Sequence, residues 1–191
     1  MVRLVLAAFL AGVVQFAWGF YFWAASPMSK EMIGKLADED KVVQALKDAN
    51  PQTGMYFVPF ADPEVMSGDS PGAAEAFQDR HAEGPLVQIM YRREGAACMD
   101  PRQMGLGFAH MVGGSFLAGL LLLMAGPGLR TYFARVLFVA LLGVFAVFAL
   151  NLAQPIWFLH PWKYHLLHSV FDVVSWVLAA IVLAALVRRA D

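Results

Sequence analysis

Four residues near the end of the chain could do chemistry together. His165, His168, Asp172 and Trp176 follow one another at steps of three, four and four residues. In an α-helix this spacing places the side chains on one face, because neighbours at i+3 and i+4 stack one above another. An ionisable group at membrane depth is costly unless it faces protein, a partner charge or water. The sequence therefore predicts a polar site on this helix, with Asp172 as a candidate proton site.

Three interpretations of this polar face remain open. In the first, His110 and His168, with His165 as a further ligand, bind a haem or a metal ion, because neutral imidazole is a common ligand. In the second, Asp172 hydrogen-bonds to His110, His168, Ser175 or a tryptophan and fixes the packing of the helices. In the third, the polar face conducts protons or a small solute.

An amide in the first helix extends the candidate polar residues to other helices. Gln15 could bond across to Asn151, Ser115 or Asp172, and a lone amide in an apolar helix more often stabilises helix packing than binds a ligand. We therefore predict a polar cluster that packs the helices together. Its members are Gln15, Asn151, Asp172 and Trp176.

The elements that carry these residues are those of a membrane protein. Of the 191 residues, 59% are hydrophobic and only 15% are charged, whereas a soluble domain has about 25% charged residues. Four apolar runs are long enough, at about 1.5 Å per residue, to cross about 30 Å of hydrocarbon. They comprise residues 4–25, 105–125, 132–151 and 164–187. The predicted fold class is an all-α integral membrane protein with four transmembrane helices.

Basic residues predict how these helices are oriented. If the four helices alternate in direction, five arginines fall on one side: Arg3, Arg130, Arg135, Arg188 and Arg189. The short connection on the other side has only Lys163. Because Lys and Arg are enriched in cytoplasmic loops, both termini should be cytoplasmic and residues 26–103 should be exported.

The exported segment, residues 26–103, predicts a small α+β cap inserted between the first and second helices. Residues 38–49 have apolar positions on one side and an acidic start that suits the helix dipole. Residues 55–60 and 86–91 are rich in β-branched or aromatic residues and are bounded by Gly or Pro, so they predict two strands that could pair. Between them we expect a mobile loop, followed by a helical turn around residues 73–80.

Small residues in the second helix predict close helix packing. Ala109 with Gly113, and Ser115 with Gly119, form small-xxx-small steps that let another backbone approach closely. We therefore expect this helix to be central. The tight connection at residues 126–128 also predicts that the second and third helices are antiparallel neighbours.

Familiar catalytic signatures are absent from the sequence. It contains no Gly-rich phosphate loop, no Gly-x-Ser-x-Gly elbow, no His-Glu-x-x-His and no Cys-x-x-Cys, and the exported segment is acidic, which argues against nucleic-acid binding. We expect a non-enzymatic accessory or interaction subunit of a membrane assembly, whose partners are membrane lipids and other membrane-protein subunits. One alternative is a haem- or metal-binding redox protein that uses His110 and His168. Another is a membrane enzyme acting on lipid or quinone, with Asp172 as its base.

A set of aromatic, Gly and Pro positions runs through nearly the whole chain. They are the run Phe16-Ala17-Trp18-Gly19-Phe20, Trp23, the segment 54–59, the pair Gly84-Pro85, and Trp157, Pro161, Tyr164, Asp172 and Trp176. These positions resemble a family of bacterial inner-membrane proteins that has no established activity. The resemblance implies four helices with a large exoplasmic loop after the first, and location in the bacterial inner membrane. In related sequences the first helix exits through Leu-Pro-Trp-His, where this chain has Ser26-Pro27-Met28-Ser29, so a role of that aromatic-His pair does not carry over.

Overall fold

The computed structural model describes residues 1–187 and divides the chain into two compact units. The helical unit comprises Met1–Lys35 and the chain from Met99 on, and the inserted unit comprises Leu36–Cys98. The inserted unit is therefore shorter than the predicted cap of residues 26–103, because residues at both ends of that segment belong to the helical unit.

Among residues 1–187, four helices are long and apolar enough to cross a membrane, as the sequence predicts. They are α1 (Val2–Ala25), α6 (Pro101–Met124), the stretch Tyr132–Trp157, and α9 (Trp162–Leu186). The third stretch is built from α7 (Tyr132–Ala146), the π-helix η2 (Val147–Asn151) and α8 (Ala153–Trp157). It extends beyond the predicted end at residue 151.

Local sequence sets the start of α6. The helix begins four residues before the predicted residue 105, because Asp100 caps it and Pro101 occupies its first position. A carboxylate oxygen of Asp100 accepts a hydrogen bond from the backbone N–H of Arg102 at 2.9 Å. A capping acid followed by proline favours a helix start, since proline has the required φ and lacks a donor that would be unpaired there.

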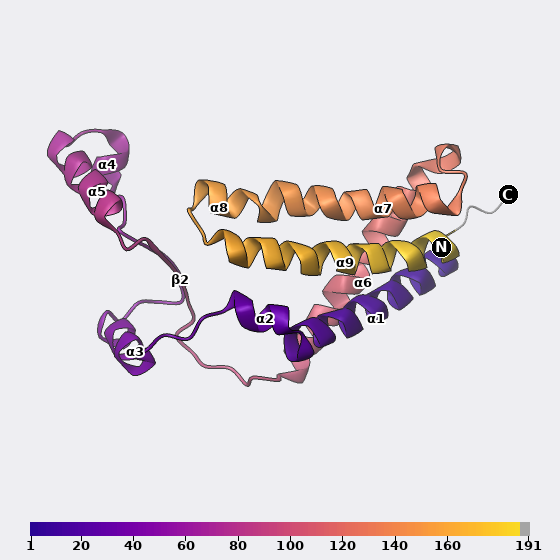
Figure 1. Ribbon diagram of the computed structural model, residues 1–191, viewed down its shortest axis with the longest axis horizontal. Helices are drawn as coiled ribbons and strands as arrows, with labels where there is room; N and C mark the ends of the chain where they lie inside the picture. The colour runs from indigo at the N-terminus through magenta and orange to yellow at the C-terminus, as the bar shows by residue number, and fades with distance from the viewer. Residues whose placement is uncertain (188–191) are drawn as a thin grey trace. The chain divides into compact units, whose positions relative to one another are not determined.

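The long helices pack in an order that the sequence did not predict. Helix α9 lies between α1 and α7 (Figure 1), and α1 contacts both α6 and α9. Helix α6 packs mainly along α1 and makes few contacts with α7 or α9. The expectation that the second helix is central is wrong. The tight turn η1 (Gly126–Gly128) joins α6 to α7 but does not make them close neighbours, because a turn reverses the chain while side-chain packing selects the contact surfaces.

Small residues allow the helices to approach closely. A Cβ atom built on Gly119 would lie 2.5 Å from Cδ1 of Leu4, and one built on Gly12 would lie 2.6 Å from Cγ2 of Val112. The predicted step from Ser115 to Gly119 is thus used in the contact between α1 and α6. The other predicted step differs, because no atom lies within 4 Å of a Cβ built on Gly113.

The predicted strands pair within the inserted unit. Strand β1 (Gly54–Val58) runs antiparallel to β2 (Val87–Tyr91), with Gly54 opposite Tyr91 and Val58 opposite Val87. The expected amphipathic helix is α3 (Glu39–Asp48), which Asp38 caps by accepting from the backbone N–H of Lys41 at 3.3 Å. The connection between the strands contains α4 (Pro63–Ser67) and α5 (Pro71–Glu83), more helix than the sequence predicted.

A short helix that the sequence did not predict follows α1. Helix α2 (Pro27–Met32) begins after Ser26, whose hydroxyl accepts from the backbone N–H of Met28 at 3.1 Å. Its Met32 is buried together with Phe22 and Phe171. Residues after α1 therefore fold back onto the helical unit.

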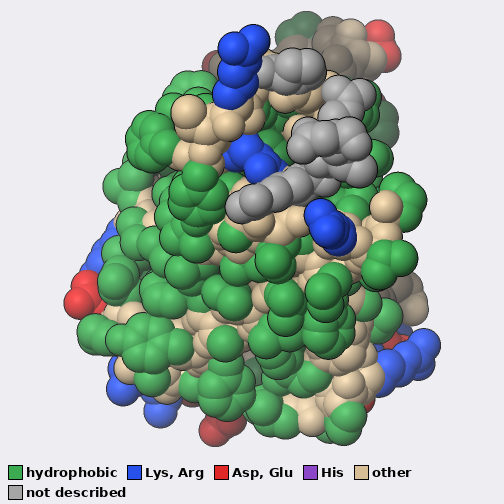
Figure 2. Space-filling model, turned by 90° about the vertical axis from the view of Figure 1, so that its right-hand side faces the viewer, with side chains coloured by type: hydrophobic (Ala, Val, Ile, Leu, Met, Phe, Trp, Pro, Cys, Tyr) green, Lys and Arg blue, Asp and Glu red, His purple; other side chains and the backbone are tan. Residues whose placement is uncertain are grey.

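Basic side chains lie at the end of the helical unit where α1 begins and η1 joins α6 to α7. Arg3 is in the first turn of α1, and Arg130 and Arg135 flank the start of α7. Figure 2 shows Lys and Arg side chains at this end among hydrophobic ones. Arg188 and Arg189, which the orientation prediction also uses, lie outside the described residues.

Candidate functional site

A hydrogen-bonded chain of polar residues surrounds the start of α9. Nδ1 of His165 lies 2.7 Å from Oδ1 of Asn151, and Nε2 of His165 lies 3.2 Å from Nδ1 of His160. The Asn151 amide donates to the hydroxyl of Ser169 at 3.0 Å and to the His165 carbonyl at 3.2 Å. The Ser169 hydroxyl donates to the same carbonyl at 2.6 Å. His165 is only 6% exposed, so this network lies inside the helical unit.

The partners in this network assign the protons on its neutral imidazoles. Because a carbonyl only accepts, the Asn151 amide nitrogen must face the His165 backbone, which leaves Oδ1 facing the His165 ring. Nδ1 of His165 then carries the proton, and its Nε2 is an acceptor. It follows that His160 donates from its Nδ1. The neutral network therefore has a defined direction, from His160 through His165 to Asn151.

The break in the third long helix positions Asn151. Asn151 ends the π-helix η2, and Pro155 follows four residues later within α8. Proline has no N–H to donate to the carbonyl four residues before it, so a regular helix cannot continue through this point. Single π-turns often occur at functional sites, and here the turn carries the amide that bonds to His165.

A second polar group, formed by His168 and Asp172, lies further along α9. Nδ1 of His168 lies 3.1 Å from Oδ2 of Asp172, at the i, i+4 spacing that the sequence predicts for one helix face. Their side chains are 28% and 29% exposed, so neither is sealed in the core. The His168 ring also lies 5.9 Å from that of Trp23 and stacks 5.8 Å from that of Tyr164. This acid-base pair can hold one proton between an imidazole and a carboxylate.

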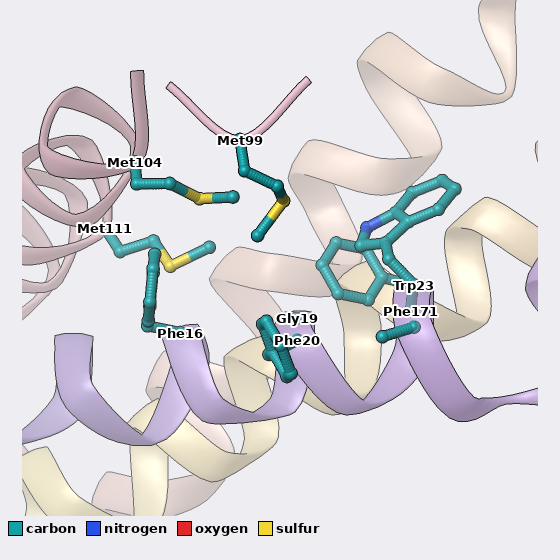
Figure 3. A pocket seen from close by; sticks show the side chains of 9 residues that line it. Phe16, Gly19, Phe20, Trp23, Met99, Met104, Met111 and Phe171 are labelled. Atoms are coloured by element: carbon teal, nitrogen blue, oxygen red, sulfur yellow. The ribbon is translucent and has the colours of Figure 1, made fainter. Parts of the chain in front are cut away.

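An apolar groove lies on the α1 side of this pair. It has a volume of about 460 Å³ and is lined by residues of α1, α6 and α9 and by Met99, which lies just before α6. Figure 3 shows Met99, Met104 and Met111 on one side of the groove and Trp23 on the other. Trp23 also contacts His168, and it therefore connects the groove to the His168–Asp172 pair.

The groove was missed by sequence reasoning. Its methionines are irregularly spaced along the chain, and nothing in that spacing indicates that they face α1. Ser169 was also missed, although its position four residues after His165 is the spacing at which a serine can bond back to a helix carbonyl.

The predicted packing cluster is divided among separate places. Gln15 accepts a hydrogen bond from the Ser115 hydroxyl at 2.8 Å, and both residues are buried. Asn151 bonds to the start of α9, and Asp172 bonds to His168. Trp176 packs against Gly143 of α7 and Gly114 of α6. The split arises because Gln15 lies in the contact between α1 and α6, whereas Asn151 and Trp176 lie where the third long stretch packs against α9.

His110 lies apart from the other predicted site residues. It is exposed on α6, and among residues 1–187 no hydrogen bond, ion pair or ring contact involves it. Nor do His, Cys, Asp and Glu side chains of the described residues form a group of three or more that could hold a metal ion. The pairing of His110 with His168 on a haem or metal therefore stays a prediction, and the observed contacts do not favour it.

Comparisons with known protein families, with curated proteins and with solved structures found no match. No match therefore supports the resemblance to a family of bacterial inner-membrane proteins.

Proposed function

We propose that this protein is a non-catalytic interaction subunit of a membrane assembly, with its four long helices in the bilayer. The observation that supports this function is the outward face of α6. That face carries His110 without a partner in the described part of the chain, whereas Gln15, Asn151 and Asp172 each bond to another polar side chain of the long helices.

The internal hydrogen bonds favour structural roles for the remaining polar groups. The Gln15–Ser115 bond joins α1 to α6, and Asn151 joins the end of η2 to α9. Hydrogen bonds between helices in a bilayer contribute about 0.6–2 kcal/mol each, so two such links stabilise the bundle usefully. These residues need no substrate to explain them.

The outward face of α6 is different, because it is apolar apart from one imidazole. We define this face by Leu106, His110, Gly113, Leu117 and Leu121, which are all exposed and follow one another at steps of three or four residues. A polar side chain facing lipid at membrane depth is costly unless another protein group satisfies it. We infer that a protein partner covers this face in the membrane.

Photo-crosslinking in intact membranes tests this function. A benzophenone amino acid at Leu117, on the outward face of α6, should give one discrete protein adduct whose partner mass spectrometry identifies. The matched control is Leu141 of α7, since the exposed fractions of the two leucines are similar, 60% and 54%. Equal yields of protein adducts at both positions, or none at Leu117, would contradict the proposal.

The proposed location is a bacterial inner membrane, with both termini in the cytoplasm and the inserted unit in the periplasm. The basic end of the helical unit supports this orientation. Cys98, which is free and exposed, should react with a membrane-impermeant maleimide added to spheroplasts. Gly128→Cys in a Cys98→Ser background should react only in inverted vesicles, because it lies in the turn after α6. The opposite result would reverse the orientation.

A second candidate function is the binding of a lipid or quinone in the apolar groove. The observation that favours it is the neighbouring His168–Asp172 pair, which could serve the polar end of a ligand whose tail fills the groove. Small-molecule pockets are commonly apolar with a few polar groups, and about 300–1,000 Å³ in volume. If the protein is an enzyme, Asp172 would act as a base on the lipid or quinone, and this activity also requires that the ligand binds in the groove.

Filling the groove tests this candidate. A Cβ on Gly19 would meet Met111 and Phe171 at ordinary distances of 3.7 and 3.8 Å, so Gly19→Ala should be tolerated while Gly19→Leu should obstruct the cavity. We expect photoreactive lipid or quinone probes to label the wild type and Gly19→Ala, and Gly19→Leu at least about tenfold less, as for a loss of about 1.4 kcal/mol in binding. Equal labelling of all three proteins would exclude the groove as the binding site.

A further inference from the structure

We infer that the partner on the outward face of α6 is a second copy of this chain, docked so that the two His110 imidazoles hydrogen-bond to each other. This inference rests on the proposed function and names its partner. It is carried by the depth of His110, by the hydrogen-bonding capacity of imidazole and by the open space at Gly113.

His110 lies close to the middle of its helix. It is the tenth of the 24 residues in α6, which places it roughly 4 Å from the helix midpoint at about 1.5 Å per residue. Neither end of the helix is within easy reach of an imidazole, whose short side chain cannot extend to the interface as Lys and Arg can. A partner must therefore supply a polar group within the hydrocarbon region.

A second copy supplies such a group by symmetry. Two copies inserted in the same orientation are related by a two-fold axis along the membrane normal, so His110 of each lies at the same depth. A neutral imidazole has one donor nitrogen and one acceptor nitrogen. One ring can thus donate to the other, and no second type of residue is required.

The surroundings of His110 suit a close parallel contact. Gly113 lies about one turn further along the same face, and a Cβ built on it has no atom within 4 Å. Among the described residues, no neighbouring segment packs against Gly113. Because glycine has no side chain, a second helix could approach closely at this position. Leu106, Leu117 and Leu121 flank this point and are exposed. Residues 103–129 contain no Asp, Glu, Lys or Arg, so no like charges would oppose the contact.

Disulfide crosslinking in membranes tests the inference. In a Cys98→Ser background, Leu117→Cys should form a disulfide between two differently tagged copies, and Leu141→Cys on α7 should not. Gly113→Leu added to Leu117→Cys should abolish the crosslink, because the new side chains keep the helices apart. His110→Leu should reduce the dimer equilibrium constant roughly three- to twenty-fold, as expected for one lost hydrogen bond between helices, and His110→Asn should retain more of it.

The outcomes separate this inference from the proposed function. A protein adduct at Leu117 that contains a different protein would overturn the second copy while supporting an interaction subunit. Failure of every Leu117 crosslink, together with equal labelling of Leu117→Cys and Leu141→Cys by a lipid-soluble thiol reagent, would overturn both. A Leu117→Cys dimer that is unchanged by Gly113→Leu would also contradict the contact between the two copies. Thermal unfolding of Gly113→Leu is the control, and an unchanged midpoint would show that this variant is folded.

Discussion

Gly143→Ala is expected to destabilise the helical unit more than any other single methyl group added to it. A Cβ at this position would overlap Cβ and Cγ of Trp176, atoms that cannot move without moving α9. Overpacking of this kind costs about 1–3 kcal/mol, and sometimes more. The measurement is thermal unfolding in detergent, where each kcal/mol should lower the midpoint by about 2–4 °C.

The matched control is Gly107→Ala in α6. No atom lies within 4 Å of a Cβ at Gly107, so the same change should be neutral or slightly stabilising, because alanine favours helix over glycine. Equal midpoints for the two variants would show that Trp176 does not pack against α7 as described. The contact of Trp176 with Gly143, which sets the rotation of α9 against α7, would then be absent.

The second large effect is expected for His165→Ala. This change removes a buried ring that bonds to Asn151 and His160, and it leaves the Asn151 oxygen without its donor. A buried polar group left unsatisfied costs about 1–3 kcal/mol, in addition to the lost packing of the ring. Thermal unfolding should show a clear fall in the midpoint, and His165→Phe should recover only the packing part of it.

His168→Ala, three residues along the same helix, provides the comparison. Its side chain is partly exposed whereas that of His165 is buried, so His168→Ala should remove less packing and lower the midpoint less. Asn151→Ala combined with His165→Ala should cost less than the sum of the two single changes, since both remove the same bond. Strict additivity, or a loss from His168→Ala as large as that from His165→Ala, would contradict the network.

Several features of the site could be predicted from residue spacing alone. The i, i+4 bond between His168 and Asp172 follows from helix geometry. The pairing of two short strands and the cap at Asp38 also follow from local patterns. Each of these depends on neighbours in the sequence or on a strong residue preference.

Other features depended on helix rotation, which no local pattern encodes. The spacing of His165 and Trp176 suggested one shared face, and both meet the third long stretch, His165 at Asn151 and Trp176 at Gly143, but nothing in the spacing said which helix this face would meet. Small residues suggested a central second helix. Instead, α9 contacts both α1 and α7, whereas α6 contacts mainly α1. In an apolar chain nearly every face of a helix can be buried, so hydrophobic periodicity does not select the contact face.

The sequence by itself determined the four long apolar helices, their approximate ends and the small inserted α+β unit, because length, hydropathy and capping residues act over a few turns. Tertiary structure alone decided that His165 closes a buried network, that a groove lies beside Trp23 and that His110 faces outward. The physical reason is that these properties come from the order and rotation of packed helices, which depend on the fit of side chains between distant segments.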